Sequence, residues 1–301
     1  MTGLRQAIAA RSPAVARKAI RMGEHYVRRN REWLQVLREL KGSDPGSQRI
    51  LLRSSLVAPL TSLRRLDGFE PPLLLADAQL EARGVGRFNI RAGTDDIIHI
   101  LTAREPLVRR AIEQRLKPGD VFVDAGANIG FYSVLAARLV GAAGKVVAIE
   151  MMPETAAALR SHLAINGCDN VEVIEQALSD RSGDHVTARF NPRKFGQASI
   201  AAVGDEPQDQ AGDLATIEVM TVTLDEVLAH HSSIKLIKMD LEGAEYAALV
   251  GLGERIDNVE AVIFETNGED PRIMDYFAQH GFAVARLYGH DFLAQRAPHR
   301  P

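Results

Sequence analysis

One stretch strongly limits what this chain can fold into. Residues 121–132 read VFVDAGANIGFY, an apolar run that ends in an acidic residue and leads into two glycines. An apolar, β-branched run is typical of a strand covered on both faces. Gly126 and Gly130 lack a Cβ, so they allow a sharp turn and a close ligand. Residues 133–140 then continue as an apolar helix whose N-terminal amides favour electron-rich groups.

The spacing of these glycines distinguishes two kinds of cofactor. A dinucleotide-binding turn follows the pattern GxGxxG, which places a pyrophosphate on the helix N-terminus. Here the pattern is DxGxxxG, with Asp124 just before the first glycine. A carboxylate there would repel a pyrophosphate but suits the amino group and sulfonium of S-adenosylmethionine. We therefore expect that cofactor, and a strand-to-helix turn without a ligand is the plain alternative.

Charge is distributed unevenly along the chain. The whole sequence has a formal net charge of -3. Its first 66 residues carry 14 Lys or Arg against 4 Asp or Glu, a net of +10, and the remainder carries 22 against 35, a net of -13. This asymmetry predicts a basic, mostly helical extension, residues 1–86, and an acidic catalytic domain, residues 87–301. The extension would bind phospholipid headgroups, nucleic acid or a polyanionic glycan, or simply form a solvated helix face.

The sequence indicates a reducing compartment and contains no membrane anchor. Cys168 is the single cysteine, which excludes a disulfide within the chain and favours the cytoplasm. We interpret it as a small residue at a helix end or in a loop. No continuous apolar run near the N-terminus suggests a secretory signal. The most apolar segment, residues 50–63, is interrupted by Arg53 and is too short to span a bilayer.

Periodicity predicts the remaining elements. Helices are expected over residues 4–40, 50–66 and 105–116, and a hairpin over residues 87–101 with its turn at residues 93–96. From residue 121 onward, strands alternate with helices, which implies a parallel sheet with right-handed crossovers. Two extra strands, residues 185–190 and 216–223, flank a polar loop. That loop, residues 191–212, is either a mobile lid or a surface insertion.

The next two strands of the sheet also end in candidate binding residues. Residues 145–149 form the second strand, and Glu150 follows it, where a carboxylate can accept hydrogen bonds from a ribose diol. Residues 171–174 form the third strand. Gln176 and Ala177 come after it, where an adenine ring could meet an amide and a small side chain.

Carboxylates gather after the fourth and fifth strands. Residues 240–245 read DLEGAE and follow the strand at residues 233–239, so Asp240 and Glu242 lie at its C-terminal end. Glu265 ends the fifth strand. In open α/β sheets, ligands bind at this edge, beside the point where the strand order reverses. We therefore expect these three carboxylates to lie near the reacting groups.

Two of these motifs together resemble the FkbM family of S-adenosylmethionine-dependent methyltransferases. They are VDAGANIG at residues 123–130 and IKMDLEGAE at residues 237–245, and the resemblance covers roughly residues 87–295. It implies the class I methyltransferase fold, a Rossmann-like α/β architecture. Its seven-stranded, mostly parallel sheet has helices on both faces and an antiparallel last strand. The resemblance also implies methyl transfer to oxygen, often on a sugar hydroxyl of a glycan or on a secondary metabolite.

The resemblance also implies roles for individual residues. The methionine part of the cofactor would be held by Asp124, Gly126, Asn128 and Gly130. Glu150 would bind the ribose, and Gln176 and Ala177 would flank the adenine. Asp240 and Glu242 would lie by the methyl group or the acceptor, so Asp240 serves both cofactor and catalysis.

Three hypotheses for acceptor activation stay open. Asp240, Glu265 and Asn267 could converge as oxygen ligands for Mg²⁺ or Mn²⁺, which would lower the acceptor hydroxyl's pKa. Alternatively, Glu242 or Asp240 takes the proton directly as a general base. In the third hypothesis, the carboxylates only cap the following helix and fix loops.

Other functions were weighed against O-methyl transfer. An RNA methyltransferase would use the basic extension to grip phosphates, but the sequence contains no recognisable RNA-binding module, so nucleic acid is disfavoured. A cofactor-binding scaffold without turnover would not need the carboxylates. A nicotinamide dehydrogenase is disfavoured by the glycine spacing. We expect a small-molecule or glycan acceptor, no transmembrane segment and, through the basic extension, peripheral membrane contact. The oligomeric state and the acceptor stay open.

Overall fold

The computed structural model describes residues 13–61, 71–191, 194–199, 215–266 and 270–296. The chain divides into two units, of which the first comprises residues 1–83 and 88–101. The second comprises residues 84–87 and 102–301. The predicted domain boundary after residue 86 stays a prediction.

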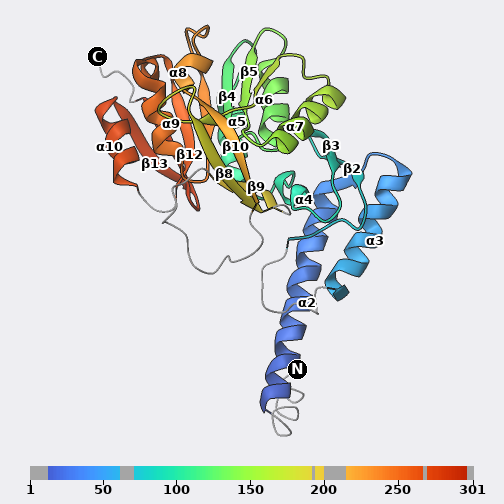
Figure 1. Ribbon diagram of the computed structural model, residues 1–301. Coiled ribbons are helices and arrows are strands. Elements are labelled where there is room, and N and C mark those ends of the chain that lie inside the picture. Colours follow the sequence, from blue (N-terminus) through green and yellow to red (C-terminus); the bar gives the residue numbers. More distant parts are fainter. Residues whose placement is uncertain (1–12, 62–70, 192–193, 200–214, 267–269, 297–301) are drawn as a thin grey trace. The chain divides into compact units, whose positions relative to one another are not determined.

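Two helices and a three-stranded sheet form most of the first unit. Helix α2 (Pro13–Glu39) and helix α3 (Pro45–Thr61) lie side by side (Figure 1). Trp33 of α2 is 1% exposed and belongs to the core. The sheet follows the order β1-β2-β3, with the strands β1 (Leu40–Gly42), β2 (Ala78–Ala82) and β3 (Gly86–Ile90). The helices predicted over residues 4–40 and 50–66 are confirmed where the structure describes them. Residues 4–12 and 62–66 of those predictions lie outside the described residues.

The hairpin predicted over residues 87–101 is wrong. Strand β3 pairs with the earlier strand β2, and the short helix α4 (Asp96–His99) replaces the expected second strand. The Asp96 carboxylate accepts hydrogen bonds from the Arg91 backbone N–H at 3.2 Å and from its guanidinium at 2.8 and 2.7 Å. These bonds hold the chain in a tight turn, which sequence alternation alone did not reveal.

Seven strands form the sheet of the second unit, in the order β13-β14-β12-β11-β4-β5-β6. The order reverses beside β4, because β5 continues on one side of it and β11 lies on the other. Strand β14 is antiparallel to both of its neighbours, and the other pairs are parallel. The predicted class I fold is therefore confirmed, including its antiparallel last strand. The strands are β4 (Val121–Ala125), β5 (Lys145–Ile149), β6 (Val171–Ile174), β11 (Leu236–Met239), β12 (Ala261–Glu265), β13 (Phe282–Tyr288) and β14 (Asp291–Arg296).

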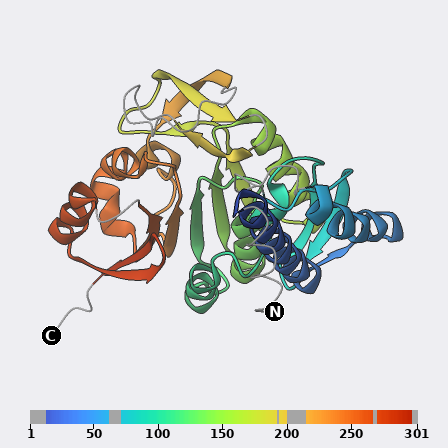
Figure 2. The ribbon, with the colours of Figure 1, turned by 90° about the horizontal axis from the view of Figure 1, so that it is seen from below.

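Helices cover both faces of this sheet (Figures 1 and 2). One face packs a core of Val123, Ile237 and Phe264 against Leu249 and Phe277. Side chains alternate along a strand, so the residues next to Val123 and Ile237 point to the opposite face. The helices are α5 (Pro106–Arg115), α6 (Phe131–Val140) and α7 (Pro153–Asn166), followed by α8 (Leu224–Val227), α9 (Glu245–Leu252), the 3₁₀ helix η2 (Gly253–Asn258) and α10 (Pro271–Gln279).

A second, four-stranded sheet follows the order β7-β10-β8-β9. Its strands β8 (His185–Asn191) and β10 (Ala215–Val222) confirm the two predicted extra strands, and β7 (Ala177–Leu178) pairs with β10. Part of the predicted polar loop is strand β9 (Lys194–Ser199), which pairs with β8. The loop's residues 200–212 lie outside the described residues, so the lid hypothesis stays untested.

Within the described part of the chain, no helix combines the length and the apolar character needed to cross a bilayer.

Candidate functional site

The turn after β4 is held tightly by its neighbours. Gly126 and Gly130 adopt φ angles of +80° and +89°, which favour glycine. A Cβ on Gly126 would lie 1.9 Å from the backbone oxygen of Asp240, and one on Gly130 would lie 2.4 Å from Leu159 Cδ1. The predicted sharp turn is confirmed, and there is no room for a side chain at either glycine. This places the first glycine directly against the chain that leaves β11.

Glu150 ties the glycine turn to the end of β5. Its Oε2 accepts a hydrogen bond from the Asn128 backbone N–H at 2.9 Å, and its Oε1 accepts one from the Met152 N–H at 2.9 Å. Asn128 has a φ of +50°, and its side-chain oxygen accepts from the Ile129 N–H at 2.8 Å. Burial raises the pKa of Glu150 to about 7, although both backbone bonds oppose that rise. Glu150 lies at the end of β5, as predicted, and its role toward a ribose stays a prediction.

Asp124 is buried inside β4, at 1% exposure. Its Oδ2 accepts a hydrogen bond from Ser133 Oγ of α6 at 2.6 Å. Burial raises its pKa, and the nearby Lys238 ammonium works in the opposite direction. Asp124 and Lys238 are register partners in neighbouring strands. Asp124, which was predicted to face a cationic ligand, therefore lies beside the buried Lys238 ammonium of the protein itself.

Lys238 links the two halves of the site. It is 5% exposed, and its Nζ lies 3.3 Å from Asp240 Oδ2. The same ammonium lies 5.2 Å from the ring centre of Tyr132, whose hydroxyl donates to Glu105 Oε2 at 2.9 Å. The carboxylates around Lys238 raise its pKa despite its burial, so the side chain stays charged. One lysine thereby lies beside both Asp124, just before the glycine turn, and Asp240, at the start of the loop after β11.

The loop after β11 is also built around a buried glutamate. Glu245 accepts hydrogen bonds from the backbone N–H groups of Leu241 at 2.8 Å and Gly243 at 3.1 Å. Glu242 lies between these two amides with a φ of +50°. Left-handed backbone is uncommon for a glutamate, so the Glu245 bonds hold a conformation that the chain would otherwise disfavour.

A cavity of about 390 Å³ opens at the C-terminal edge of β11 and β12. Glu242 lies at its exposed mouth, where partial desolvation and the charges of Asp240 and Glu245 raise its pKa to about 7. Desolvation and Asp240 raise the pKa of Glu265 to about 8, and burial with Glu105 raises that of Asp291 to about 7. The predicted catalytic residues are thus brought together. The lining comprises Asp240, Glu242, Gly243, Glu245, Tyr246, Glu265, Thr266, Asp270, Arg272 and Ile273.

The residues predicted to flank adenine lie apart from these carboxylates. Ala177 begins β7, is 2% exposed and packs with Met152, Ala188 and Val219. Gln176 directly precedes it and is partly exposed. Their position follows β6, as expected, and their role toward an adenine stays a prediction.

The structure gives no support for the metal hypothesis. Asp240 is paired with Lys238, and Asn267 lies outside the described residues. Among the residues that are described, no group of three His, Cys, Asp or Glu side chains is arranged to hold a metal ion.

Sequence reasoning missed several residues of this site. Lys238 carried a signal, because it is the one charged residue in the otherwise apolar strand β11. Tyr132 and Ser133 follow the second glycine at fixed positions of α6, yet only the fold shows what they contact. Glu105 and Asp291 had no signal, since they come from distant parts of the chain.

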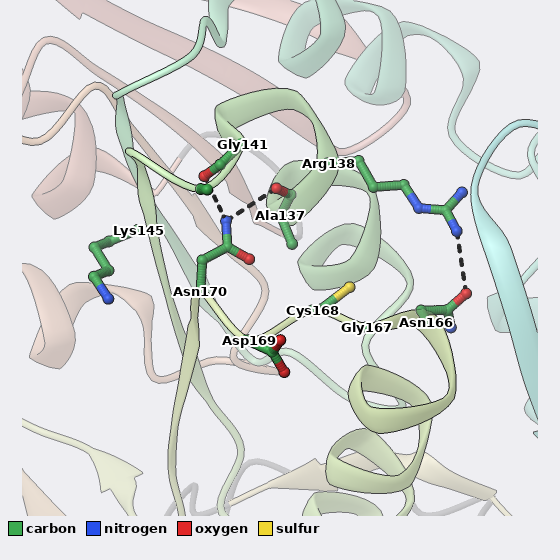
Figure 3. A pocket seen from close by; sticks show the side chains of 10 residues that line it. Ala137, Arg138, Gly141, Lys145, Asn166, Gly167, Cys168, Asp169 and Asn170 are labelled. Carbon is green, nitrogen blue, oxygen red and sulfur yellow. Dashed lines mark hydrogen bonds between the residues drawn. The ribbon is translucent and has the colours of Figure 1, made fainter.

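A second cavity of about 330 Å³ lies at the opposite edge of the sheet, near the start of β5 (Figure 3). The Asn170 amide donates to the carbonyls of Ala137 at 3.0 Å and Gly141 at 2.9 Å. Cys168 is buried there, and burial raises the pKa of its thiol, which makes it a poor nucleophile. Its interpretation as a small residue at a helix end is confirmed, because it follows the α7 cap Gly167. The carboxylates and the glycine turn both belong to the other edge.

A family model and several known proteins are similar to parts of this chain. A family model described as the methyltransferase FkbM domain matches residues 124–284, more than half of the chain. Methyltransferase sdnD of Sordaria araneosa is 28% identical over 192 residues, 54% of this chain and 74% of that protein. The 31-O-demethyl-FK506 methyltransferase FkbM of Streptomyces tacrolimicus is 29% identical over 204 residues, 59% of this chain and 77% of that protein. A crystal structure of precorrin-6y C5,15-methyltransferase from Geobacter metallireducens GS-15 gives a TM-score of 0.40 at 14% identity, covering 63% and 88% of the two chains.

The family model spans both loops of the site, from Asp124 just before the first, through Glu242 in the second, to Glu265 at the end of β12. The two curated relatives each match across about three quarters of their own length. The chain therefore belongs to the FkbM family of S-adenosylmethionine-dependent methyltransferases.

Proposed function

We propose that the chain transfers the methyl group of S-adenosylmethionine to a hydroxyl oxygen of a sugar, a glycan or a secondary metabolite. The observation that carries this proposal is the carboxylate-lined cavity at the ends of β11 and β12, directly against the glycine turn at Gly126. Carboxyl groups with a pKa near neutrality are suited to accept a hydroxyl proton at neutral pH. The substrate named for the Streptomyces relative, 31-O-demethyl-FK506, agrees with methylation of oxygen.

The groups around the glycine turn fit a cationic ligand that carries a diol. The turn itself, with Asp124, Gly126, Asn128 and Gly130, would hold the methionine part. Each oxygen of Glu150 accepts one backbone bond and keeps a lone pair, so it can also accept from a ribose hydroxyl. Gln176 and Ala177 would flank the adenine, and Asp240, whose backbone oxygen lies against Gly126, would also contact the methionine part.

The proposed chemistry needs one proton acceptor. S-adenosylmethionine held at the glycine turn would supply the methyl group, and its sulfur would keep the electron pair of the broken carbon–sulfur bond as the carbon–oxygen bond forms. Glu242 takes the hydroxyl proton, because its pKa of about 7 leaves it partly ionised at neutral pH. Asp240, paired with Lys238, and Glu265 orient the acceptor hydroxyl toward the cofactor. Positioning of the two reactants supplies much of the remaining acceleration.

The charge of the cavity limits the acceptor class. Five carboxylates line it, and its one lining cation within the described residues is Arg272. Arg272 is paired with Asp270 at 2.7 Å and stacks on the Tyr246 ring at 4.9 Å. A phosphate or carboxylate acceptor would be repelled here, which argues against RNA. We therefore favour a neutral polyhydroxylated acceptor.

Two further parts of this proposal concern organisation. Residues 87–301 would carry cofactor binding and catalysis, with residues 1–86 as a separate extension. A reducing compartment such as the cytoplasm would suit the buried, unpaired thiol of Cys168.

The direct test is a search for the methylated product. The purified protein is incubated with methyl-labelled S-adenosylmethionine and small-molecule or glycan extracts, and labelled products are identified by mass spectrometry. The proposal predicts an O-methylated, uncharged product that depends on Glu242 and forms in EDTA as well as without it. The Glu254→Gln variant, which changes an exposed carboxylate outside the cavity, is the matched control. A labelled RNA or carboxylate ester, or full loss of turnover in EDTA with recovery on Mg²⁺ or Mn²⁺ addition, would contradict it.

A further inference from the structure

Helix α3 differs from an ordinary surface helix in which residues it buries. Its buried residues are Ser47, Ser54 and Ser55, together with Leu51, Ala58 and Pro59. Its exposed positions include Leu52 at 45%, Leu56 at 72% and Leu60 at 57% exposure. Surface helices normally turn their leucines inward and their serines to water. The burial of the serines and the exposure of the leucines therefore each need an explanation.

The inner face uses its serines as anchors for the next segment of the chain. Ser54 Oγ accepts a hydrogen bond from the Leu75 N–H at 3.0 Å and donates to the Ile50 carbonyl at 2.8 Å. Ser47 Oγ accepts from the Gln79 N–H at 3.1 Å. These bonds hold the chain that leads into β2. The buried serines thus have hydrogen-bond partners beside the buried Leu51 and Ala58, and these contacts do not involve Leu52, Leu56 or Leu60.

The outer face of α3 combines two rows of side chains. Leu52, Leu56 and Leu60 recur every four residues and form one row. The second row follows the same spacing, with two exposed arginines and a valine that is 38% exposed. We call the six residues the outer face of α3: Arg49, Leu52, Arg53, Leu56, Val57 and Leu60. A cation row alongside an apolar row is typical of a helix that lies in a membrane interface.

Charge identifies the partner that suits this face. The first 66 residues carry a net charge of +10 within a chain of net -3. Helix α2, which lies beside α3, adds exposed Lys18, Arg31 and Arg38 to the same unit. A symmetric contact between two copies through this face would bring Arg49 and Arg53 together with their counterparts. Anionic lipid headgroups would instead attract every one of these cations.

We propose that the outer face of α3 docks the protein onto an anionic phospholipid membrane surface. The helix has 17 residues and lies parallel to the surface without crossing the bilayer. Its leucine row enters the boundary between headgroups and acyl chains. Arg49 and Arg53 extend along that boundary and contact lipid phosphates with their guanidinium groups. This would hold a methyltransferase next to a membrane, whatever its acceptor.

Vesicle cosedimentation of the full-length protein tests this proposal. Vesicles of phosphatidylcholine with roughly 30% phosphatidylglycerol should bind the protein, and pure phosphatidylcholine vesicles should bind it at least about 10-fold more weakly. Raising the salt from about 0.1 to 0.5 M should weaken binding, because the headgroup attraction is screened. Equal binding to both vesicle types would overturn the proposal.

Matched variants locate the binding face. Leu56→Gln/Leu60→Gln should reduce partition by roughly 10- to 100-fold, since it removes two apolar anchors. Arg49→Gln/Arg53→Gln should reduce it by roughly 10-fold or more. The controls are Leu107→Gln, an exposed leucine of α5, and Arg110→Gln/Arg181→Gln, two exposed arginines of the second unit. All four should keep the wild-type far-UV circular dichroism spectrum and cofactor affinity.

Two results would contradict the proposal. In the first, the outer-face variants bind anionic vesicles as tightly as the controls. In the second, sedimentation velocity shows a wild-type dimer that Leu56→Gln/Leu60→Gln dissociates, while neither protein binds vesicles. The second result would identify this face as a contact between copies of the chain.

Discussion

The loop after β4 and the loop after β11 are held by the same kind of hydrogen bond, but their carboxylates are placed differently. In each, a buried glutamate accepts backbone N–H bonds: Glu150 holds Asn128, and Glu245 holds Leu241 and Gly243. Each loop also contains one non-glycine residue at positive φ, Asn128 in the first and Glu242 in the second. The two loops meet where Gly126 lies against Asp240.

The difference lies in where the carboxylates of each loop point. Asp124, before the first loop, is buried and bonded to Ser133, and Glu150 is bonded to the backbone through both oxygens. In the second loop, Asp240 and Glu242 line the cavity, with Glu265 close by. A fixed set of acceptors suits ligand binding, and a set that faces a cavity suits proton transfer. We infer that the first loop binds the cofactor and that the second performs the acceptor chemistry.

The largest expected effect is a loss of kcat when the second loop is changed and the first is left intact. Glu242→Gln should lower kcat for methyl transfer by about 10²- to 10⁴-fold, because it removes the proposed general base. The KM for S-adenosylmethionine should stay within about threefold of wild type, since the first loop is untouched. Steady-state kinetics on the identified acceptor measure both values, with Glu254→Gln as the control. A Glu242→Gln enzyme with normal kcat would transfer the role to Asp240 or Glu265.

A smaller effect is expected where the loops touch. Gly126→Ala would place a Cβ 1.9 Å from the Asp240 carbonyl at a φ of +80°. We expect a loss of about 3–5 kcal/mol in unfolding free energy, from both overpacking and backbone strain. Gly167→Ala is the matched control, because its φ of +65° and ψ of +37° are left-handed α and no atom lies within 4 Å of the new Cβ. It should lose only about 1–2 kcal/mol in urea unfolding. Equal losses would mean that the contact between the loops is not tight.

The sequence predicted the scaffold of this site better than its electrostatics. The motif at residues 121–132 and the alternation of strands and helices were sufficient for the class I fold, because both depend on local pattern. Asp240, Glu242 and Glu265 were predicted to converge, since parallel strands end at one edge. Lys238 and Glu105 were missed because both contact Tyr132, which lies far from each of them in the chain.

Two local predictions failed or fell short for similar reasons. The hairpin at residues 87–101 was inferred from alternation. In the structure β3 pairs with residues 78–82, and the Asp96–Arg91 hydrogen bonds stabilise a turn in the segment that follows β3. The helix at residues 50–66 was expected, yet nothing in its periodicity revealed that Ser54 would be buried and Leu56 exposed. Hydrogen bonds to a neighbouring segment decided both outcomes.

The smallest expected effect is the pH dependence of stability, to which both loops contribute. The pKa values of Glu150 and Glu242 are raised to about 7, and that of Glu265 to about 8, from 4.5. A carboxyl with a raised pKa binds its proton more tightly in the folded state, so folding is favoured at acidic pH and loses stability as pH rises through 7 to 8. The cofactor-free protein should melt roughly 3–8 °C lower at pH 8.0 than at pH 6.0.

Variants in each loop test which carboxyl groups cause the pH dependence of Tm. Glu150→Gln and Glu242→Gln should each flatten the dependence of Tm on pH, because each removes one of the titrating carboxyl groups. Glu254→Gln should leave it unchanged. Differential scanning fluorimetry across the range is sufficient for the comparison. A Tm that rises between pH 6.0 and 8.0 would contradict the raised pKa values.

The most direct test of the proposed separation between the loops is calorimetric titration of S-adenosylmethionine into wild type, Glu150→Gln and Glu242→Gln. Loss of the charged acceptor for the ribose hydroxyls should weaken binding to Glu150→Gln by roughly 10- to 100-fold. Binding to Glu242→Gln should stay within about threefold of wild type, since that carboxylate serves the acceptor. Equal weakening of both variants, or unchanged affinity of Glu150→Gln, would contradict the assignment of cofactor binding to the first loop.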